Sequence, residues 1–438
     1  MRVVDLIEKK REGRAHSHAE LEALVLGYVR GEVPDYQLAA WLMAVCWRGM
    51  QPRELTALTD VMAASGERLD LSSIGRPVAD KHSTGGVGDK TSLVVIPLVA
   101  ACGVPVGKMS GRGLGFTGGT IDKLESFPGI RVDLPASAFV RQLRERGIVI
   151  TGQSADLAPA DGKLYALRDV TGTVPSLPLI ASSIMSKKLA AGAHAIVLDV
   201  KTGSGAFMRD RAAARALAQA MVGIGTAAGR KMAAVVSDMS QPLGRAVGNA
   251  LEVREALETL AGTGPAEFSR FAVELASTVV DLATDGQQAQ PQVESALRSG
   301  AGLDALRRMV EAQGGDTSAF HDPSRLLTAR LAQPLLAWQD GFVARVDALA
   351  VARASNLLGA GRERKGDPID LAVGVVLQAR VGDRIEAGQP LLTIHANDAR
   401  RLEEARRVLQ TGVELTEPPV QSPPLILERV SAAGPRPG

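Results

Sequence analysis

The alternation of strand-like and helix-like segments after Val78 limits the fold of this chain more than any other feature. Short runs rich in β-branched residues, such as AIVLDVK at 195–201 and AAVVSD at 233–238, are each followed by a stretch with helical spacing. Strands that alternate with helices usually pair in parallel, because each helix carries the chain back across one face of the sheet. The sequence therefore predicts an α/β domain with a mostly parallel sheet.

Helical patterns precede this region and interrupt it once. Within the first 66 residues, SHAE at 17–20 forms a capping box, Asp35 is an expected N-cap, and a further helix is expected to begin near Pro52. A second helical patch covers about 161–191. We expect this patch to pack with the N-terminal helices.

The pattern changes again after about residue 333. GVVLQARVGDRIEAGQPLLTIHA at 374–396 has short strands and glycine turns, similar to the hairpin of a biotinyl or lipoyl carrier. Its turn lacks the lysine that carriers modify, so a structural module is favoured over a carrier or ligand-binding module. The tail from Glu417 is rich in proline, and disorder is expected at its end.

The predicted fold class is therefore α/β, with a small all-α domain, a large α/β domain with a mostly parallel sheet, and a C-terminal α+β module. The predicted boundaries are 1–66 and 161–192 for the α domain, 76–155 and 193–332 for the α/β domain, and 333–438 for the module. The module is expected to contain a hairpin like that of a barrel-sandwich domain and to pack with the α/β domain.

Composition excludes several kinds of partner. The 50 basic and 48 acidic residues nearly cancel, and aromatic residues make up only 3%, so neither a basic groove nor a base-stacking platform for nucleic acid is expected. The apolar run at 93–106 is short and broken by prolines, which argues against a membrane span.

Cys46 and Cys102 cannot form a disulfide framework, and the N-terminus has no secretory pattern, so we expect a cytoplasmic protein.

A G-x-G-x-x-G pattern, formed by Gly113, Gly115 and Gly118, suggests at first a dinucleotide site. That fingerprint needs a strand that ends at its first glycine and a helix that begins at its last. Here the strand candidate VPVGKM ends three residues too early, and a helix can begin only near Thr120. The spacing between the strand, the glycines and the helix therefore argues against an NAD site, and no organic cofactor is predicted.

A second glycine cluster, DKHSTGGVGDKTS at 80–92, resembles a Walker A loop but has Asp89 where that motif has glycine. A carboxylate there would repel a polyphosphate. One phosphate could still bind, because glycines allow the backbone to approach it and a helix that begins at Thr91 or Ser92 favours an anion.

Either glycine cluster alone could be an ordinary turn. Two of them after adjacent strands favour a ligand site, because ligands bind at the carboxyl ends of strands in α/β sheets. The candidate phosphate ligands are one cation and four hydroxyls: Lys81, Ser83, Ser92, Ser110 and Thr120.

Six motifs together resemble the pyrimidine-nucleoside and thymidine phosphorylases in order and spacing: DKHSTGGVGD, SGRGLGFTGGTIDKLES, DLAPADGKLYALRD, SSIMSKKLAAG, DVKTGSGAFM and DMSQPLGRAVGNALEVREA. The resemblance runs from about Arg2 to Val413. It implies a homodimer with its active site between an α and an α/β domain. It also implies reversible phosphorolysis of uridine, thymidine or deoxyuridine to free base and (deoxy)ribose 1-phosphate, with inorganic phosphate as co-substrate.

The resemblance assigns the five candidates above to phosphate, and Arg168, Ser183 and Lys187 to the base, with His82 beside them. Breaking the N-glycosidic bond leaves negative charge on the pyrimidine, which Arg168 and Lys187 can stabilise. Ser183 and Lys187 are four residues apart and share a helix face. His82 could donate a hydrogen bond or a proton to the base O2 while phosphate attacks the anomeric carbon.

These side chains also have structural interpretations. Arg168 could form an ion pair with Asp169, and His82 could be a satisfied polar group. Lys188, next to a candidate ligand, is expected on a solvated helix face. Trp41, Leu42 and Trp47 could form a dimer face or an intramolecular core.

The resemblance further implies a potassium site, which maps to Gly88, Leu243, Ala246 and Glu255. Lys90 stands where related enzymes have a threonine at this site, and its ammonium group could replace or weaken the ion. Phe116 stands where the family has a histidine in the glycine loop.

Lys108 bears on specificity. Thymidine-restricted enzymes of the family have Met at this position, whereas the broader pyrimidine type has Lys. A charged donor here could recruit water or contact the ribose 2′-hydroxyl. We therefore expect a broad enzyme, and a thymidine-restricted phosphorylase is the alternative.

Two related reaction types are weaker alternatives. Anthranilate phosphoribosyltransferase has the same fold but needs magnesium and a pyrophosphate site, and DKHSTGGVGD lacks its GTGGD order. A nucleoside monophosphate phosphorylase of the archaeal type would have a long N-terminal extension and a second phosphate pocket, and neither is seen in the sequence.

Overall fold

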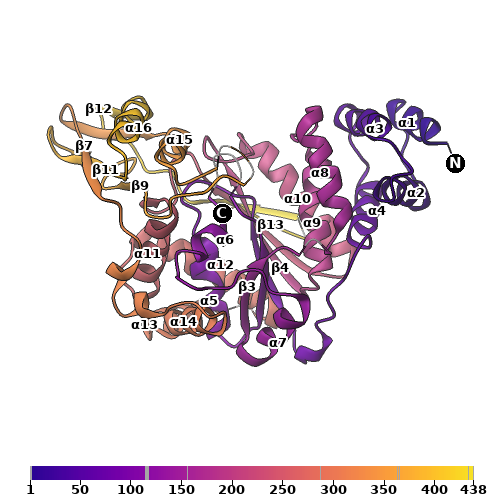
Figure 1. The fold of residues 1–438 in the computed structure, drawn as a ribbon, viewed down its shortest axis with the longest axis horizontal. Coiled ribbons are helices and arrows are strands. Elements are labelled where there is room, and N and C mark those ends of the chain that lie inside the picture. Colours follow the sequence, from indigo (N-terminus) through magenta and orange to yellow (C-terminus); the bar gives the residue numbers. More distant parts are fainter. Residues whose placement is uncertain are drawn as a thin grey trace.

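The structure of the protein is a computed structural model that describes residues 2–113, 118–154, 156–286, 288–362, 364, 366–432 and 434–437. Gly115 and Phe116 lie outside the described residues. Figure 1 shows an all-helical part at the N-terminal end, a central sheet flanked by helices, and a smaller module with short strands at the opposite end. None of the helices in the described part of the chain has the length and apolar character needed to cross a membrane.

Four N-terminal helices and two later ones make up the all-helical part. They are α1 (Val3–Arg11), α2 (His18–Val29), α3 (Asp35–Arg48), α4 (Pro52–Ala63), α8 (Pro159–Thr171) and α9 (Leu177–Ala190). Leu164 of α8 and Leu179 of α9 lie in one apolar core with Leu24 and Trp41. The chain therefore returns to this part after it has formed its first three strands.

The N-termini of these helices show how local sequence sets their starts. The Ser17 hydroxyl accepts from the Glu20 N–H at 3.3 Å and Glu20 Oε2 accepts from the Ser17 N–H at 2.7 Å, so the predicted capping box is formed. The prediction of Asp35 as an N-cap is wrong. Pro34 takes that position and Asp35 is the first residue of α3, where its carboxylate still favours the positive end of the helix.

The described residues form a main sheet of seven strands. They are β1 (Ala79–Ser83), β2 (Val106–Ser110), β3 (Ile148–Gly152), β4 (Ala195–Thr202), β5 (Lys231–Asp238), β13 (Ile426–Ser431) and β14 (Gly434–Pro437). Their order across the sheet is β14-β13-β5-β4-β1-β2-β3. The strands β1 to β5 pair in parallel, which confirms the mostly parallel sheet.

Alternate residues of the buried strands face two helical layers. On β4, Val197 belongs to one core and Ile196 and Leu198 to another, which is the period-2 pattern of a strand covered on both faces. The helices that accompany the sheet are α5 (Thr91–Ala101), α6 (Thr120–Leu124), α7 (Ala136–Arg146), α10 (Arg211–Ala227), α11 (Asn249–Leu260), α12 (Ala266–Thr284), α13 (Gln290–Arg298) and α14 (Ala301–Ala312).

The C-terminal module is α+β, as the sequence predicts. It contains β7 (Leu331–Leu336), β8 (Gly341–Val346), α15 (Ala348–Leu358), β9 (Gly374–Leu377), β10 (Arg384–Ile385), β11 (Pro390–Ala396), α16 (Ala399–Gly412) and β12 (Val413–Thr416). One of its sheets includes β6 (Ala246–Val247), which comes from the α/β region and pairs with β9. This pairing joins the module to the α/β domain.

The expectation of disorder at the end of the tail is wrong for residues 434–437, which form β14 and pair with β13. Residues 426–431 form β13, which pairs antiparallel with β5 and so extends the main sheet rather than the C-terminal module. Glu428 of β13 also forms ion pairs with Arg211 and Arg215 of α10, at 3.4 and 2.7 Å. The tail gains its order from these contacts with residues that are distant in the sequence.

Candidate active site

The strands β1 and β2 are neighbours in the sheet, and their C-terminal ends meet at one edge. β1 ends with His82 and Ser83, and β2 ends with Met109 and Ser110. The prediction that the two glycine clusters follow adjacent strands is confirmed. This edge is where ligands bind in parallel α/β sheets.

A cavity of about 520 Å³ lies between these strand ends and the helices α8 and α9. The hydroxyls from the two glycine clusters lie on its α/β side, and the predicted base ligands lie on its helical side. Of the residues predicted to bind phosphate or nucleoside, those that line the cavity are His82, Ser83, Ser92, Lys108, Ser110, Thr120, Arg168, Ser183 and Lys187.

Lys81 is the predicted phosphate ligand that does not line the cavity. Its side chain is fully buried, and its ammonium group contacts the Thr91 hydroxyl and lies 3.4 Å from Asp199 Oδ2. Burial lowers the pKa of Lys81, although Asp89 and Asp199 act in the opposite direction. In this geometry Lys81 contributes positive charge behind the hydroxyl groups, and direct contact with phosphate stays a prediction.

Asp89 connects several groups of the first glycine cluster. Its carboxylate accepts hydrogen bonds from the Ser83 hydroxyl and, at 2.6 Å, from the Thr91 hydroxyl. Burial raises the pKa of Asp89, but Lys201, Lys81 and Lys123 overcome this and hold the pKa well below its usual range. Because one hydroxyl has one proton, Ser83 can donate to a bound anion only when it turns from Asp89.

His82 has an imidazole nitrogen, Nε2, that is buried and has no hydrogen-bond partner within the described protein. Burial holds the pKa of His82 well below its ordinary value, and the charges of Lys188, Lys108, Lys81 and Lys187 lower it further. The ring is therefore neutral near pH 7. A neutral imidazole can still donate one hydrogen bond from a ring N–H into the cavity.

Lys108 lies on β2 with its ammonium group directed to the carbonyl oxygen of Lys81, at 2.8 Å. Burial, together with the charge of Lys188, lowers the pKa of Lys108 to about 7. A bound anion would favour its charged form, so Lys108 can change protonation state when ligands bind.

Arg168 donates to three backbone carbonyls, those of Thr173, Val174 and Leu179, at 3.4, 2.7 and 3.0 Å. The structural alternative of an ion pair with Asp169 is not what holds it. These bonds tie α8 to the loop that follows it and to the start of α9, and Arg168 lines the wall of the cavity.

Ser183 and Lys187 lie on one face of α9, as their spacing predicts. Lys187 Nζ lies 3.2 Å from Ser183 Oγ and also contacts Asp161 of α8. Asp161 was not among the predicted site residues. It holds the ammonium group of Lys187 toward the cavity that all three residues line.

The prediction that Lys188 lies on a solvated face is wrong. Its side chain is buried, with Nζ 2.7 Å from Asp80 Oδ2 and 3.2 Å from the carbonyl oxygen of Met109. The signal in the sequence was Asp80, because a carboxylate inside a buried strand requires a buried cation. Lys188 therefore links α9 to both β1 and β2.

Sequence reasoning also missed the apolar wall of the cavity. This wall can contact the flat faces of a pyrimidine ring. On α9, Ile180 and Ile184 are each one turn from a polar ligand, a spacing that could have indicated them. The main apolar residues of the lining are Tyr165, Val174, Ile180, Ile184, Phe207 and Met208.

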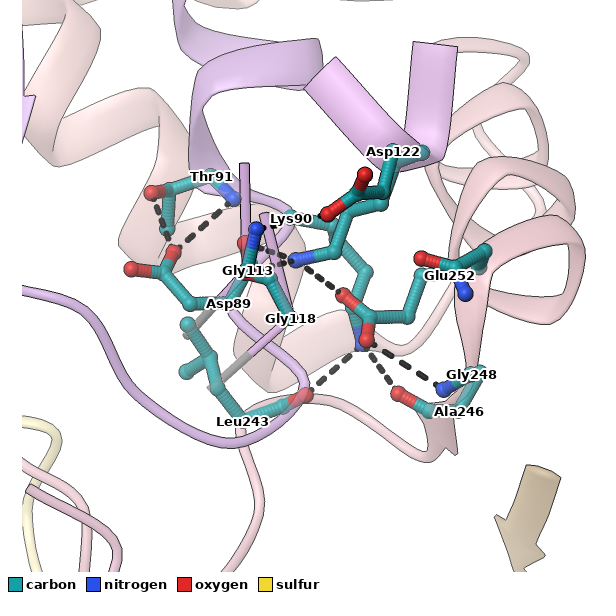
Figure 2. Close-up of polar contacts among 12 residues, drawn as sticks. Asp89, Lys90, Thr91, Gly113, Gly118, Asp122, Leu243, Ala246, Gly248 and Glu252 are labelled. Carbon is teal, nitrogen blue, oxygen red and sulfur yellow. Dashed lines mark hydrogen bonds and ion pairs between the residues drawn. The ribbon is translucent and has the colours of Figure 1, made fainter. Parts of the chain in front are cut away.

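The positions expected to form a potassium site surround the side chain of Lys90 instead. Lys90 Nζ donates to the carbonyl oxygens of Leu243 and Ala246, at 2.8 and 2.9 Å (Figure 2). It also lies 2.7 Å from Glu255 Oε2. The carbonyl of Gly88 accepts from the backbone N–H of Lys90. The ammonium group of Lys90 thus already occupies the space between the oxygens of Leu243, Ala246 and Glu255. These oxygens do not fit a potassium ion in addition.

Comparison with known proteins first defines the class. Residues 75–303 match the family model described as glycosyl transferase family, a/b domain, and residues 4–66 match the helical bundle domain of the same family. Anthranilate phosphoribosyltransferase from Thermus thermophilus has the same fold, with a TM-score of 0.58 and 20% identity over 70% of this chain and 98% of that chain. The matched models place the all-helical part and the α/β domain in this glycosyl transferase family.

The C-terminal module narrows the class further. Residues 342–416 match the pyrimidine nucleoside phosphorylase C-terminal domain. The pyrimidine-nucleoside phosphorylase of Geobacillus stearothermophilus is 52% identical over 98% of this chain and 100% of the relative. That of Staphylococcus haemolyticus (strain JCSC1435) is 50% identical over 95% of this chain and 96% of the relative. The chain belongs to the pyrimidine-nucleoside phosphorylase family.

Proposed function

We propose that this enzyme catalyses the reversible phosphorolysis of pyrimidine nucleosides in the cytoplasm, with inorganic phosphate as co-substrate and no organic cofactor. The products are the free base and (deoxy)ribose 1-phosphate. The observation that supports this most is the cavity with hydroxyl groups on one wall and a cationic, partly apolar base site on the other. A phosphate and a nucleoside could bind there side by side.

The phosphate side supplies hydrogen bonds and positive potential. Ser83, Ser92, Ser110 and Thr120 would donate to the phosphate oxygens, and the N-terminal end of α5 adds its dipole. Asp89 limits the site to one phosphate group, because its carboxylate faces the same cavity. An oxygen of the dianion would then attack C1′ of the sugar.

The base side would stabilise the leaving group. The bond from C1′ to the ring nitrogen breaks as the bond from C1′ to a phosphate oxygen forms, and the electron pair moves onto the pyrimidine. Lys187 and Arg168 would stabilise the resulting negative charge. His82 would donate a hydrogen bond from its neutral ring to the base O2, and a bound phosphate dianion would raise the pKa of His82 toward proton transfer.

Broad specificity is proposed from Lys108, with uridine, thymidine and deoxyuridine as substrates. Its buried ammonium group reaches the cavity and could bind water or the ribose 2′-hydroxyl. A Lys108→Met variant should lower kcat/KM for uridine more than for thymidine. An unchanged ratio would remove the argument from Lys108, and wild-type enzyme that acts on thymidine alone would favour the alternative, a thymidine-restricted phosphorylase.

A homodimer is proposed from the exposed apolar residues of α3. Trp41 and Leu42 belong to the intramolecular core, whereas Trp47 and Tyr36 are 82% and 74% exposed. Together with Met43 they follow helical spacing along one face of α3. Exposed aromatic residues gathered on one face are typical of protein interfaces.

Base release is the direct test of the function. Uridine and thymidine would be incubated with the enzyme, with and without inorganic phosphate, and the free base separated by chromatography. Release from both that requires phosphate is the expected result. Release that requires pyrophosphate and magnesium would favour the phosphoribosyltransferase type instead, and no release would contradict the proposal.

A further inference from the structure

Two lysines next to the phosphate-binding residues are held by two glutamates of one helix. Lys90 lies just before α5 and Lys123 lies in α6, and both side chains are almost completely buried. Their partners Glu255 and Glu252 are one turn apart on α11, and each ion pair has an N–O distance of 2.7 Å. The mechanism above uses neither pair.

Lys123 contacts both glycine clusters at once. Its Nζ donates to the carbonyl oxygen of Asp89 at 2.7 Å and to that of Gly118 at 3.5 Å. Asp89 belongs to the first cluster and binds the hydroxyl of Ser83. Gly118 belongs to the second and lies two residues before Thr120. One ammonium group therefore connects the backbones that carry the proposed phosphate ligands.

The preceding residue holds the other described end of the second cluster. Asp122 accepts from the backbone N–H of Gly113 at 2.6 Å and forms an ion pair with Arg362 at 2.8 Å. Two successive residues of α6 thus fix Gly113 and Gly118. The position of this loop depends on α6, and the position of α6 relative to the first cluster depends on Lys123.

The chemistry of Lys123 permits only a narrow geometry. A buried ammonium group has three donors, and leaving one unpaired is costly. Its three partners, Asp89, Gly118 and Glu252, come from three separate segments of the chain. The two carbonyl hydrogen bonds and the 2.7 Å ion pair with Glu252 can form together only when the two clusters and α11 have their observed spacing.

We propose that Lys123, held by Glu252, is a positioning residue that sets the distance between the two loops that bind inorganic phosphate. Lys123 does not line the cavity, so it acts through the backbone of the loops and not by contact with substrate. This inference rests on the proposed function.

The test compares two double variants that each remove a buried lysine–glutamate pair without leaving an unpaired charge. Lys123→Met with Glu252→Gln removes the proposed positioning pair. Lys10→Met with Glu54→Gln is the matched control, because that pair is equally buried but lies in the all-helical part, away from the loops. KM for phosphate, KM for thymidine and kcat would be measured for both.

We expect the Lys123 double variant to raise KM for phosphate by about tenfold, with KM for thymidine changed by less than about twofold. The control should lose thermal stability but keep the phosphate KM of the wild type. Lys123→Arg, which retains the charge and several donors, should restore part of the lost phosphate affinity. An unchanged phosphate KM in the Lys123 variant, or an equal rise in the control, would overturn the proposal.

Two further measurements keep the test decisive. If the Lys123 double variant does not fold, Glu252→Gln alone is the milder change, and it should raise KM for phosphate by about threefold; no rise would overturn the proposal. Calorimetric titration with inorganic phosphate measures loop positioning without turnover. Wild-type enzyme that binds phosphate but releases no base would contradict the proposed function, while weaker phosphate binding by the variant would still support the role of Lys123.

Discussion

At the scale of single residues, the lysines around His82 differ in what holds them. Lys188 has a buried carboxylate partner in Asp80, and Lys187 has one in Asp161. The hydrogen-bond partner of Lys108 is a backbone carbonyl. Burial, followed by the charge of Lys188, lowers the pKa of Lys108 to about 7, and the more distant carboxylates of Asp80 and Asp89 offset this only in part.

Lys108 should therefore change how the free energy of unfolding depends on pH. Its pKa is about 7 in the folded protein and 10.5 in the unfolded chain, so between these pH values the unfolded chain binds the extra proton. The contribution of Lys108 to stability then rises with pH, by at most about 1.4 kcal/mol per pH unit. Lys108→Met should be more stable than the wild type near pH 7, and this advantage should shrink toward pH 10.

Thermal unfolding of both proteins at pH 6.5, 8 and 9.5 would measure this difference. The exposed Lys163→Met variant serves as the control, since its offset from the wild type should not change with pH in this way. A Lys108→Met offset that stays constant across the range would show that Lys108 remains charged in the folded protein.

Lys90 leads to a prediction about monovalent cations. Because its ammonium group already occupies the centre of the carbonyl and carboxylate set, dialysed wild-type enzyme should have the same activity in potassium and in choline chloride of equal ionic strength. Lys90→Thr removes the ammonium group and leaves Glu255 without its cation. That variant should be less stable, and potassium should restore its stability and activity more than choline does.

Strict potassium dependence of the wild-type enzyme would refute this interpretation of Lys90. The unfolding temperature and the initial rate of the wild type and of Lys90→Thr, measured in potassium chloride and in choline chloride, test the prediction.

At the scale of elements, local sequence predicted the starts of α2, α4 and α5 and the alternation of strands and helices along the chain, because caps, prolines and short apolar runs act over a few residues. It could not predict β13. That strand depends on pairing with β5 and on the contacts of Glu428 with α10, which involve residues distant in the sequence. The burial of Lys188 could not be predicted for the same reason, because other parts of the chain cover its helix, α9, on both sides.

The Glu428 contacts give a test of the tail. Glu428→Ala would leave Arg211 and Arg215 without their partner and should lower the free energy of unfolding by about 1–2 kcal/mol, a moderate value because both arginines are partly exposed to solvent. Urea unfolding would measure it. Glu414→Ala, which breaks an exposed pair with Arg345, should cost much less, and equal losses would argue against a stabilising role for the tail.

At the scale of the whole molecule, the cavity lies between parts that the chain connects more than once. α8 and α9 pack in the helical core but also form one wall of the cavity, and α9 leads directly into β4. The sequence predicted this arrangement through the resemblance of its motifs. The apolar wall and the location of Lys81 outside the lining depend on packing between the parts, which no single motif contains.

The proposed dimer face makes a prediction at this scale. Trp47→Glu places a charge on the exposed aromatic residues of α3 and should shift the protein from dimer to monomer in light scattering. Trp338→Glu, at an exposed tryptophan of the C-terminal module, should leave the mass unchanged. A monomeric wild type, or a dimer that survives Trp47→Glu, would contradict this interface.

The pairing of β13 with β5 has a consequence for how the protein is made. Until the ribosome has released residues 426–431, β5 has an open edge whose N–H and C=O groups are free to pair with another chain. A nascent chain therefore passes through a period in which all of its proposed catalytic residues have been synthesised but this edge of its sheet is still unprotected. Aggregation during translation should therefore be sensitive to changes in β13, although none of its residues lines the cavity.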